Sequence, residues 1–166
     1  MHPAALPLDV LLTDCDVERT RRGGPGGQHR NKVETAVVIK HRPTDVQGQA
    51  SERRSQDLNR QAALQRLRIN LALKIRQPVE PGQPRNEAWH SRVRARQIAV
   101  NSEHADFPAL LAEALDRLTA CDWDVSVAAA QLEVTTSQLV KFLQQEPEAC
   151  LQLNRQRAAR QLRPLR

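Results

Sequence analysis

Hydrophobic and polar residues alternate over the first third of the chain, and this alternation predicts a small β-sheet. Residues 17–21 alternate and predict a first strand. β-Branched and apolar residues dominate 35–41, which predicts a second strand, and 46–50 predict its returning partner. Residues 43–45, Pro-Thr-Asp, suit the turn between these two strands. We therefore expect an antiparallel sheet, with the apolar patch at 8–12 packed on it.

Helical periodicity replaces alternation over residues 55–76. Basic residues occupy one part of the helical surface, whereas the apolar residues form a broad stripe consisting of Leu58, Ala62, Leu64, Leu67, Ile69, Leu71 and Ile75. Ser55 suits the N-cap, because its hydroxyl can accept a hydrogen bond from a backbone N–H of the first turn. Strands followed by one long helix predict an α+β fold with the sheet packed on that helix.

Residues 77–85 contain three prolines and one glycine, which indicates a boundary. A short helix is expected to begin at residue 86. Arg92, Arg94 and Arg96 then alternate, and this spacing suits an extended basic segment equally well.

From residue 105 the composition shifts to Ala and Leu with helical spacing. The pattern predicts four helices, of which the first is amphipathic: 108–120, 125–132, 136–143 and 146–162. The middle pair has the spacing of a helix-turn-helix unit. The sequence thus predicts three parts, namely a first domain at 1–76, a basic linker at 77–104 and a small all-α bundle at 105–166.

The positive charge of the chain is concentrated in its first half. The net charge is +6 over the whole chain, but residues 18–76 alone carry 14 basic and 5 acidic side chains. Residues 105–166 carry 7 basic and 8 acidic side chains. A cationic patch of this kind favours phosphate contacts, which give affinity without base specificity. We therefore expect the first domain to bind nucleic acid.

The remaining composition narrows the class of protein. Cys15, Cys121 and Cys150 are far apart in sequence, and the five histidines form no ligand cluster, so we expect reduced thiols, no metal and no cofactor. No run approaches the roughly 20 apolar residues of a membrane span, and the N-terminus lacks the features of a secretory signal. We expect a cytoplasmic monomer.

The most informative segment is residues 22–32, R-G-G-P-G-G-Q-H-R-N-K. Glycine allows backbone conformations and close approaches that side chains prevent, and Pro25 restricts its own φ. One amide side chain, Gln28, follows the glycines, and cations flank both sides. A tip with few side chains on a cationic base suits insertion into a crowded polyanionic cavity.

The wider sequence resembles the catalytic domain of bacterial peptide chain release factors and of the short, stop-codon-independent factors that rescue stalled ribosomes. The resemblance covers residues 19–76 and rests on four stretches: G-P-G-G-Q-H-x-N-K at 24–32, T-A-V at 35–37, H-R-P-T-D-V at 41–46 and E-R-R-S-Q-D-L-N-R-Q-A-A-L at 52–64. Gly23, Arg30 and Val33 depart from the usual Ser, Val and Thr of that family. These departures concern positioning of the loop more than the activity.

The resemblance implies hydrolysis of the ester that joins a nascent peptide to tRNA. Gly26, Gly27 and Gln28 are the catalytic residues that it implies, in a protruding loop. The backbone N–H of Gln28 would donate to the developing oxyanion, and its neutral amide would orient water. The ribosome would supply the rest of the active site, so the implied partners are large-subunit ribosomal RNA and peptidyl-tRNA.

Cationic and polar residues around this motif are the expected RNA contacts. They fall in three groups along the sequence: Arg21, Arg22, His29, Arg30 and Lys32 near the loop; Arg53, Arg54 and Gln56 at the start of the long helix; and Arg155, Arg157, Arg160, Arg163 and Arg166 in a C-terminal tail. The known short rescue factors carry a basic tail that enters the mRNA channel of the small subunit. We expect the same of this tail, or a contact with ribosomal RNA nearby.

Two other functions stay open at this stage. Stop-codon decoding in the family uses a large separate domain, and a motif starting near residue 22 leaves no room for one ahead of it, so we expect codon-independent action. The first alternative is a non-catalytic ribosome-binding or RNA-binding factor that retains the fold. The second is a DNA-binding regulator that uses the helix-turn-helix pair, which the weakly acidic bundle disfavours.

Overall fold

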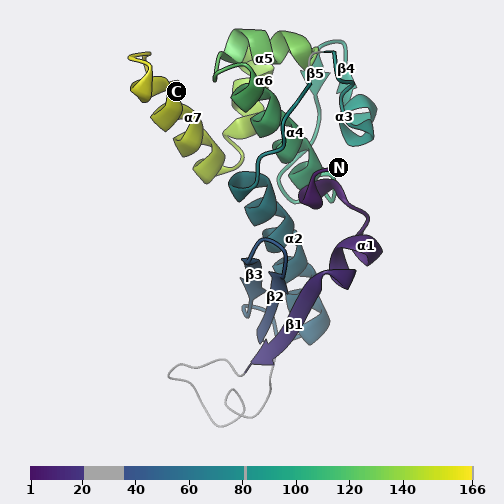
Figure 1. Ribbon diagram of the computed structural model, residues 1–166. Coiled ribbons are helices and arrows are strands. Elements are labelled where there is room, and N and C mark those ends of the chain that lie inside the picture. The colour runs from purple at the N-terminus through teal and green to yellow at the C-terminus, as the bar shows by residue number, and fades with distance from the viewer. Residues whose placement is uncertain (21–35, 81, 166) are drawn as a thin grey trace.

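The computed structural model describes residues 1–20, 36–80 and 82–165. The first part of the chain begins with a 3₁₀ helix, Pro3–Ala5, and forms an antiparallel sheet in the order β1-β2-β3 that packs on one long helix (Figure 1). Its elements are α1 Leu8–Thr13, β1 Cys15–Thr20, β2 Ala36–His41, β3 Val46–Ala50 and α2 Gln56–Lys74. The predicted α+β class is therefore confirmed.

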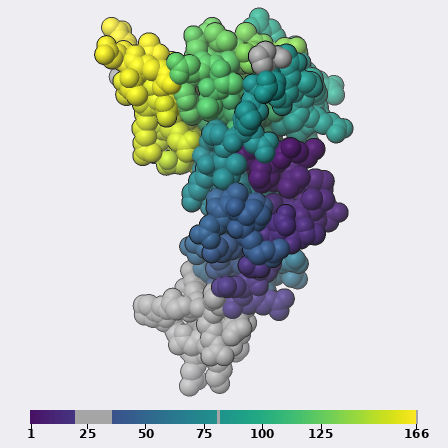
Figure 2. All heavy atoms as spheres, viewed as in Figure 1, coloured from purple at the N-terminus to yellow at the C-terminus, as the bar shows by residue number. Residues whose placement is uncertain are grey.

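The second part of the chain is helical apart from one small hairpin. Its elements are α3 Glu87–Arg92, β4 Val93–Arg94, β5 Gln97–Ile98, α4 Phe107–Ala120, α5 Val125–Gln131, α6 Thr136–Leu143 and α7 Pro147–Ala159. Figure 2 shows an elongated body, with the sheet segments towards one end and the helices α4–α7 at the other. Helix α2 connects the two, because it packs on β2 and β3 and also on α4.

Helix α4 differs from its prediction. The sequence predicts an amphipathic helix, but most of α4 is buried, including Asp116 and Arg117. Helix α4 packs against α2, α3 and α5, so little of its surface faces solvent. A helix covered from several directions is apolar nearly all round, and its few charged groups need partners inside the protein.

The hydrophobic core runs through both parts of the described structure. Ile39 of the sheet, Leu71 of α2 and Leu143 of α6 belong to one cluster of buried side chains. The division into 1–76, 77–104 and 105–166 stays a prediction. The shared core adds that the sheet and the helical part pack against each other through α2.

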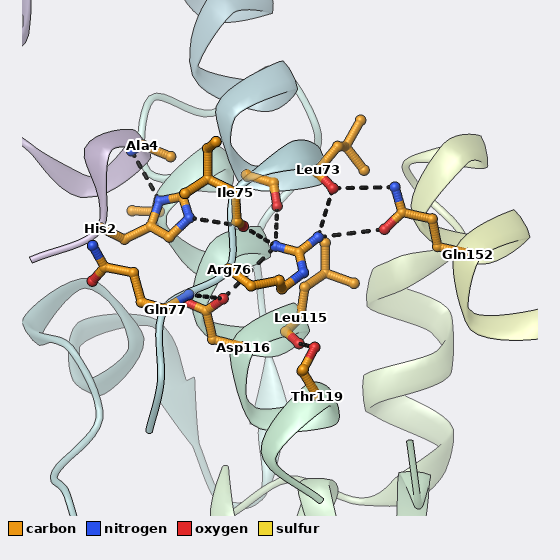
Figure 3. Close-up of polar contacts among 12 residues, drawn as sticks. His2, Ala4, Leu73, Ile75, Arg76, Gln77, Leu115, Asp116, Thr119 and Gln152 are labelled. Atoms are coloured by element: carbon orange, nitrogen blue, oxygen red, sulfur yellow. Dashed lines mark hydrogen bonds and ion pairs between the residues drawn. The ribbon is translucent and has the colours of Figure 1, made fainter. Parts of the chain in front are cut away.

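A polar junction joins α2 to the N-terminus, α4 and α7 (Figure 3). The guanidinium of Arg76 donates to the carbonyl oxygens of Ala72 at 2.6 Å and Leu73 at 2.7 Å, at the end of α2. Asp116 of α4 accepts from the backbone N–H of Gln77 at 3.1 Å and lies 3.7 Å from Arg76. Burial lowers the pKa of Arg76 and raises that of Asp116 to about 6.

His2 closes the same junction from the N-terminal side. Its Nδ1 accepts from the backbone N–H of Ala4 at 3.0 Å, and its Nε2 donates to the carbonyl oxygen of Ile75 at 3.2 Å. Both ring nitrogens are thus used by the neutral ring. Burial, opposed by the Ile75 hydrogen bond and assisted by the charge of Arg76, lowers the pKa of His2 from 6.5 to about 4.

We expect His2 to make the fold sensitive to acid. Between pH 6.5 and 4 the unfolded chain protonates this imidazole and the folded chain does not, so its contribution to stability falls as the pH falls. The shift corresponds to roughly 3 kcal/mol across that window. The difference in unfolding free energy between the native chain and His2→Gln, measured by urea denaturation, should shrink from pH 7 to pH 4.

The difference between the two proteins isolates His2 from Asp116, whose raised pKa acts in the opposite direction. The folded state binds the Asp116 proton more tightly, so Asp116 destabilises the fold as the pH rises from 3.8 through about 6. A difference between native and variant chains that stays constant from pH 7 to pH 4 would show that His2 does not carry this sensitivity.

Candidate functional site

The ends of three segments meet at one end of the sheet. Thr20 pairs with Ala36 across β1 and β2, and Val37 pairs with Ala50 across β2 and β3. Thr20, Ala36 and Ala50 therefore lie together, and the 51–55 turn into α2 starts there. We call this region the sheet end. The glycine motif belongs to residues 21–35, which join Thr20 to Ala36.

The predicted catalytic residues Gly26, Gly27 and Gln28 lie outside the described residues. The same holds for five of the predicted RNA contacts, Arg21, Arg22, His29, Arg30 and Lys32. Their roles stay predictions. What the structure adds is the position of the two chain ends between which they are held, beside the start of α2.

The turn into α2 is fixed by hydrogen bonds from two residues of the helix. The side chain of Asn59, buried in α2, accepts from the backbone N–H of Arg53 at 2.9 Å and donates to the carbonyl oxygen of Arg53 at 2.9 Å. Arg66 donates to Glu52 at 2.6 Å and to the carbonyl oxygen of Gln49 at 2.8 Å. The hydrogen bond from Arg66 holds the pKa of Glu52 near 2. The backbone that carries Arg53 is therefore well defined.

Exposed arginines surround this turn. Arg53 and Arg54 are exposed, and neither pairs with an acidic group among the described residues. Arg60, about one helical turn beyond Gln56, is also exposed and has no acidic partner among the described residues. The same is true of Arg19, near the end of β1. Arg19 and Arg60 are not among the RNA contacts predicted from the sequence, although the structure exposes both without an acidic partner among the described residues. The helical spacing from Gln56 to Arg60 is the signal that points to the second.

Ser55 and Gln56 complete the start of α2. The Ser55 hydroxyl accepts from the backbone N–H of Leu58 at 3.4 Å, which confirms the predicted N-cap. Gln56 is half-buried in the first turn of the helix. The structure therefore brings the predicted residues Arg53, Arg54 and Gln56 together at the sheet end.

Other cationic side chains of the first part pair with groups of the protein itself. Arg42 pairs with Asp16 at 2.8 Å, and Lys40 pairs with Asp45 at 2.5 Å. Arg68 is buried and donates to the carbonyl oxygens of Ala4 and Ala105. The basic excess of residues 18–76 thus overstates the charge available to a partner.

The predicted basic tail is folded on α7. Arg155 and Arg157 belong to that helix, and Arg155 pairs with Glu148 at 3.3 Å. Arg160 pairs with Asp122. Arg157 donates to the carbonyl oxygen of Arg163 at 2.9 Å, so the chain turns back at this point. Arg166 lies outside the described residues, and an RNA-binding role for these arginines stays a prediction.

The helix-turn-helix pair is built into the core. Thr135 caps α6 by accepting from the backbone N–H of Gln138 at 3.2 Å. The indole N–H of Trp89 donates to the carbonyl oxygen of Leu132 in the turn at 2.8 Å. The ring of Trp89 meets Phe142 of α6 edge-on, with 5.9 Å between ring centroids. The pair therefore packs as part of the protein interior, and DNA binding through it stays the disfavoured alternative.

Within the described residues, no group of three or more potential metal ligands comes together. None of the described helices is long and apolar enough to span a membrane.

Comparison with known proteins assigns the family. The model of the RF-1 domain matches residues 5–106, which include the glycine motif, the sheet and α2. The chain therefore belongs to the RF-1 domain family. No solved structure matches this chain.

The similar curated proteins are peptide chain release factors. Peptide chain release factor PrfB1, chloroplastic, of Arabidopsis thaliana is 48% identical over 67 residues, which is 40% of this chain and 15% of that protein. Peptide chain release factor 2 of Staphylococcus saprophyticus is 34% identical over 96 residues, 54% of this chain and 26% of the relative. The counterpart from Buchnera aphidicola is 28% identical over 131 residues, 70% of this chain and 36% of the relative. The chain thus spans only about a seventh to a third of the length of these relatives.

Proposed function

We propose that this protein hydrolyses the ester bond of peptidyl-tRNA within the ribosome and releases the nascent peptide without decoding a stop codon. One observation carries the proposal. In a chain of the RF-1 domain family, the Gly26-Gly27-Gln28 motif is attached at a sheet end that exposes several unpaired arginines. The arginines can bind the phosphates of ribosomal RNA, and the motif can promote hydrolysis of the ester.

The proposed chemistry needs a water molecule, a stabilised oxyanion and a dry environment. Water attacks the ester carbonyl, the carbonyl oxygen becomes negative, and collapse of the intermediate yields a peptide carboxylate and the free hydroxyl of tRNA. The backbone N–H of Gln28 donates to the oxyanion, and its side-chain amide orients the water. Gly26 and Gly27 allow the backbone to approach the ester closely.

Ribosomal RNA completes the site in this proposal. Arg53 and Arg54, on the turn fixed by Asn59, contact phosphates beside the loop, while Arg19 and Arg60 extend the same cationic surface. Such contacts position a protein without reading sequence. Phosphate binding at the sheet end therefore aligns the motif with the ester, and the protein has no hydrolytic activity away from the ribosome.

We also propose that release does not depend on the codon in the A site. Outside the region that matches the RF-1 domain, these 166 residues contain the helical part that begins with α4. In place of codon reading, the helical part and its basic residues serve to bind the ribosome.

We expect release from ribosomes that hold labelled peptidyl-tRNA in the P site and nothing in the A site. The purified chain should release peptide at similar rates whether the mRNA ends after the P-site codon or continues with a sense codon. Release that requires a stop codon would contradict codon independence. Ribosome binding with no release on any of these complexes would favour a non-catalytic RNA-binding factor.

A further inference from the structure

A second group of unpaired cations lies far from the sheet end. Arg94 and Arg96 belong to the β4–β5 hairpin, and Lys141 belongs to α6, at the opposite end of the molecule in Figure 1. All three are exposed, and none forms an ion pair or a side-chain hydrogen bond with any described residue. We call these three residues and the hairpin that carries two of them the hairpin end.

The hairpin presents its arginines on an unusual turn. Val93 pairs with Ile98 and Arg94 pairs with Gln97, so Ala95 and Arg96 form a two-residue connection. Both have positive φ, 48° and 63°, as a type I′ turn requires. Asn and Gly suit these positions, whereas Ala and Arg are disfavoured there. The turn places Arg96 at the tip of the hairpin, where its side chain is exposed.

The hairpin is held firmly against α6. The backbone N–H of Thr135 donates to the carbonyl oxygen of Arg96 at 3.2 Å. The side chain of Gln145 donates to the carbonyl oxygen of Val100, just beyond β5, at 3.1 Å. Val93 and Ile98 pack against the hydrophobic core. The tip therefore keeps its position relative to α6, and little order is lost when a partner binds.

Lys141 lies beside the hairpin, and two acidic residues of this region are paired with other arginines. A hollow of about 260 Å³ separates residues 98–100 from α6, and Lys141 lines it together with Gln138 and Gln145. Asp106 pairs with Arg92 at 2.7 Å, and Glu133 pairs with Arg85 at 2.8 Å. Neither of these two acids therefore neutralises Arg94, Arg96 or Lys141.

We infer that Arg94, Arg96 and Lys141 form a second RNA-binding surface that contacts the phosphate backbone of ribosomal RNA. This inference rests on the proposed function, since it takes the ribosome as the partner. Helix α2, of 19 residues and about 28 Å, extends from the sheet end to the helical part. One end of the protein thus faces peptidyl-tRNA while the other binds RNA at a distance.

The hairpin end suits this contact better than the C-terminal arginines do. Arg155 and Arg160 already pair with acidic side chains, and Arg157 donates to a backbone carbonyl. Acidic side chains of the protein partly offset the charges of Arg155 and Arg160, whereas Arg94 and Arg96 have no acidic partner among the described residues. Among the described C-terminal arginines, Arg163 is likewise exposed without an acidic partner.

The test removes the hairpin charges without disturbing the turn. Arg94→Gln combined with Arg96→Asn removes two charges and places at residue 96 an amino acid that accepts positive φ. Ala95→Asn is the matched control, because it changes the same turn and keeps both arginines. A second comparison, Arg155→Gln with Arg160→Gln, removes two charges from α7 and the residue after it. Ribosome binding of each full-length protein is measured over a series of salt concentrations.

We expect the Arg94→Gln/Arg96→Asn protein to bind ribosomes more weakly. The plot of log affinity against log salt should become less steep, with the magnitude of its negative slope smaller by roughly two. Ala95→Asn should leave the slope unchanged, and the α7 pair should change it less than the hairpin pair. Native affinity and slope for the hairpin variant would overturn the inference. Tighter binding of the native chain to a DNA duplex than to ribosomes would also overturn it.

Peptide release separates this inference from the proposed function. At saturating concentration the hairpin variant should release peptide at the native rate, with a higher concentration needed for half-saturation. If the native chain releases no peptide but the hairpin charges still govern ribosome binding, the proposed function fails and the inference stands. If release is normal and the hairpin charges have no effect on binding, the inference alone fails.

Discussion

Replacing Gly27 by alanine is expected to reduce peptide release by on the order of a hundredfold or more, with ribosome binding retained. The loss of one well-placed oxyanion donor typically has an effect of this size. A Cβ at residue 27 restricts the backbone of the motif and moves the Gln28 N–H away from the ester oxygen. Single-turnover release from saturated ribosomes measures the chemical step separately from binding.

A second glycine of the same segment provides the matched control. Gly23 stands where the family usually has serine, so Gly23→Ser should leave release close to native. Gln28→Ala should also slow release, but less decisively, because the variant keeps the backbone N–H. Native release rates for Gly27→Ala and Gln28→Ala together would mean that the motif is structural and that the proposed chemistry is wrong.

The second large effect is expected in the fold, at Gly48→Ala. A Cβ on Gly48 of β3 would lie 2.3 Å from the carbonyl oxygen of Ala63 and 2.3 Å from the backbone nitrogen of Leu67, both in α2. These are backbone atoms of a packed helix, so no flexible side chain can move aside. Overpacking of this kind destabilises a protein by about 3 kcal/mol, a large part of an ordinary domain's stability. Urea denaturation followed by circular dichroism measures it.

The neighbouring position on the same strand is the control. Gln47 is exposed, and Gln47→Ala should change the unfolding free energy by no more than about 0.5 kcal/mol. Asn59 of α2 fixes the turn that contains Arg53, so displacement of α2 in Gly48→Ala should also lower release in the fraction that still folds. Equal denaturation midpoints for the native chain and Gly48→Ala would contradict the close approach of β3 and α2.

The two ends of the molecule divide the proposed work. The sheet end holds the motif and its flanking arginines, and in our proposal the hairpin end adds RNA affinity at a distance. Binding through both ends raises the effective concentration of the motif at its substrate without any new contact at the ester. In this proposal, two separate contacts hold the motif at the ester, although the protein supplies only part of the active site.

Local chemistry was sufficient to predict much of the fold. The returning strand Val46–Ala50 and the helix Thr136–Leu143 have the bounds that alternation and periodicity predict. Ser55 caps its helix as predicted, because an N-cap depends on the few residues that follow it. The motif that carries the functional proposal is likewise a local feature, since its residues are consecutive.

Properties that depend on distant partners could not be predicted in the same way. The sequence shows 25 basic residues but does not say which of them have acidic neighbours in space. Arg160 meets Asp122 and Arg92 meets Asp106 only because the helices fold together, whereas Arg94 and Arg96 meet no acid in the part of the chain that the structure describes. The alternation of arginines at 92, 94 and 96 left helix and extended structure equally open. Packing against α6 selected the hairpin.

By itself, the sequence determined the three-stranded sheet, the long helix with its Ser55 cap and the glycine motif, because each depends on propensities and hydrogen bonds within a few residues. Tertiary structure alone decided the burial of α4, the neutral state of His2 and which of the described cations have no acidic partner. These properties depend on desolvation and on charges brought together from distant parts of the chain, where burial shifts a pKa and a nearby acid neutralises an arginine. Asp116 illustrates this, since its raised pKa exists only after α4 is enclosed.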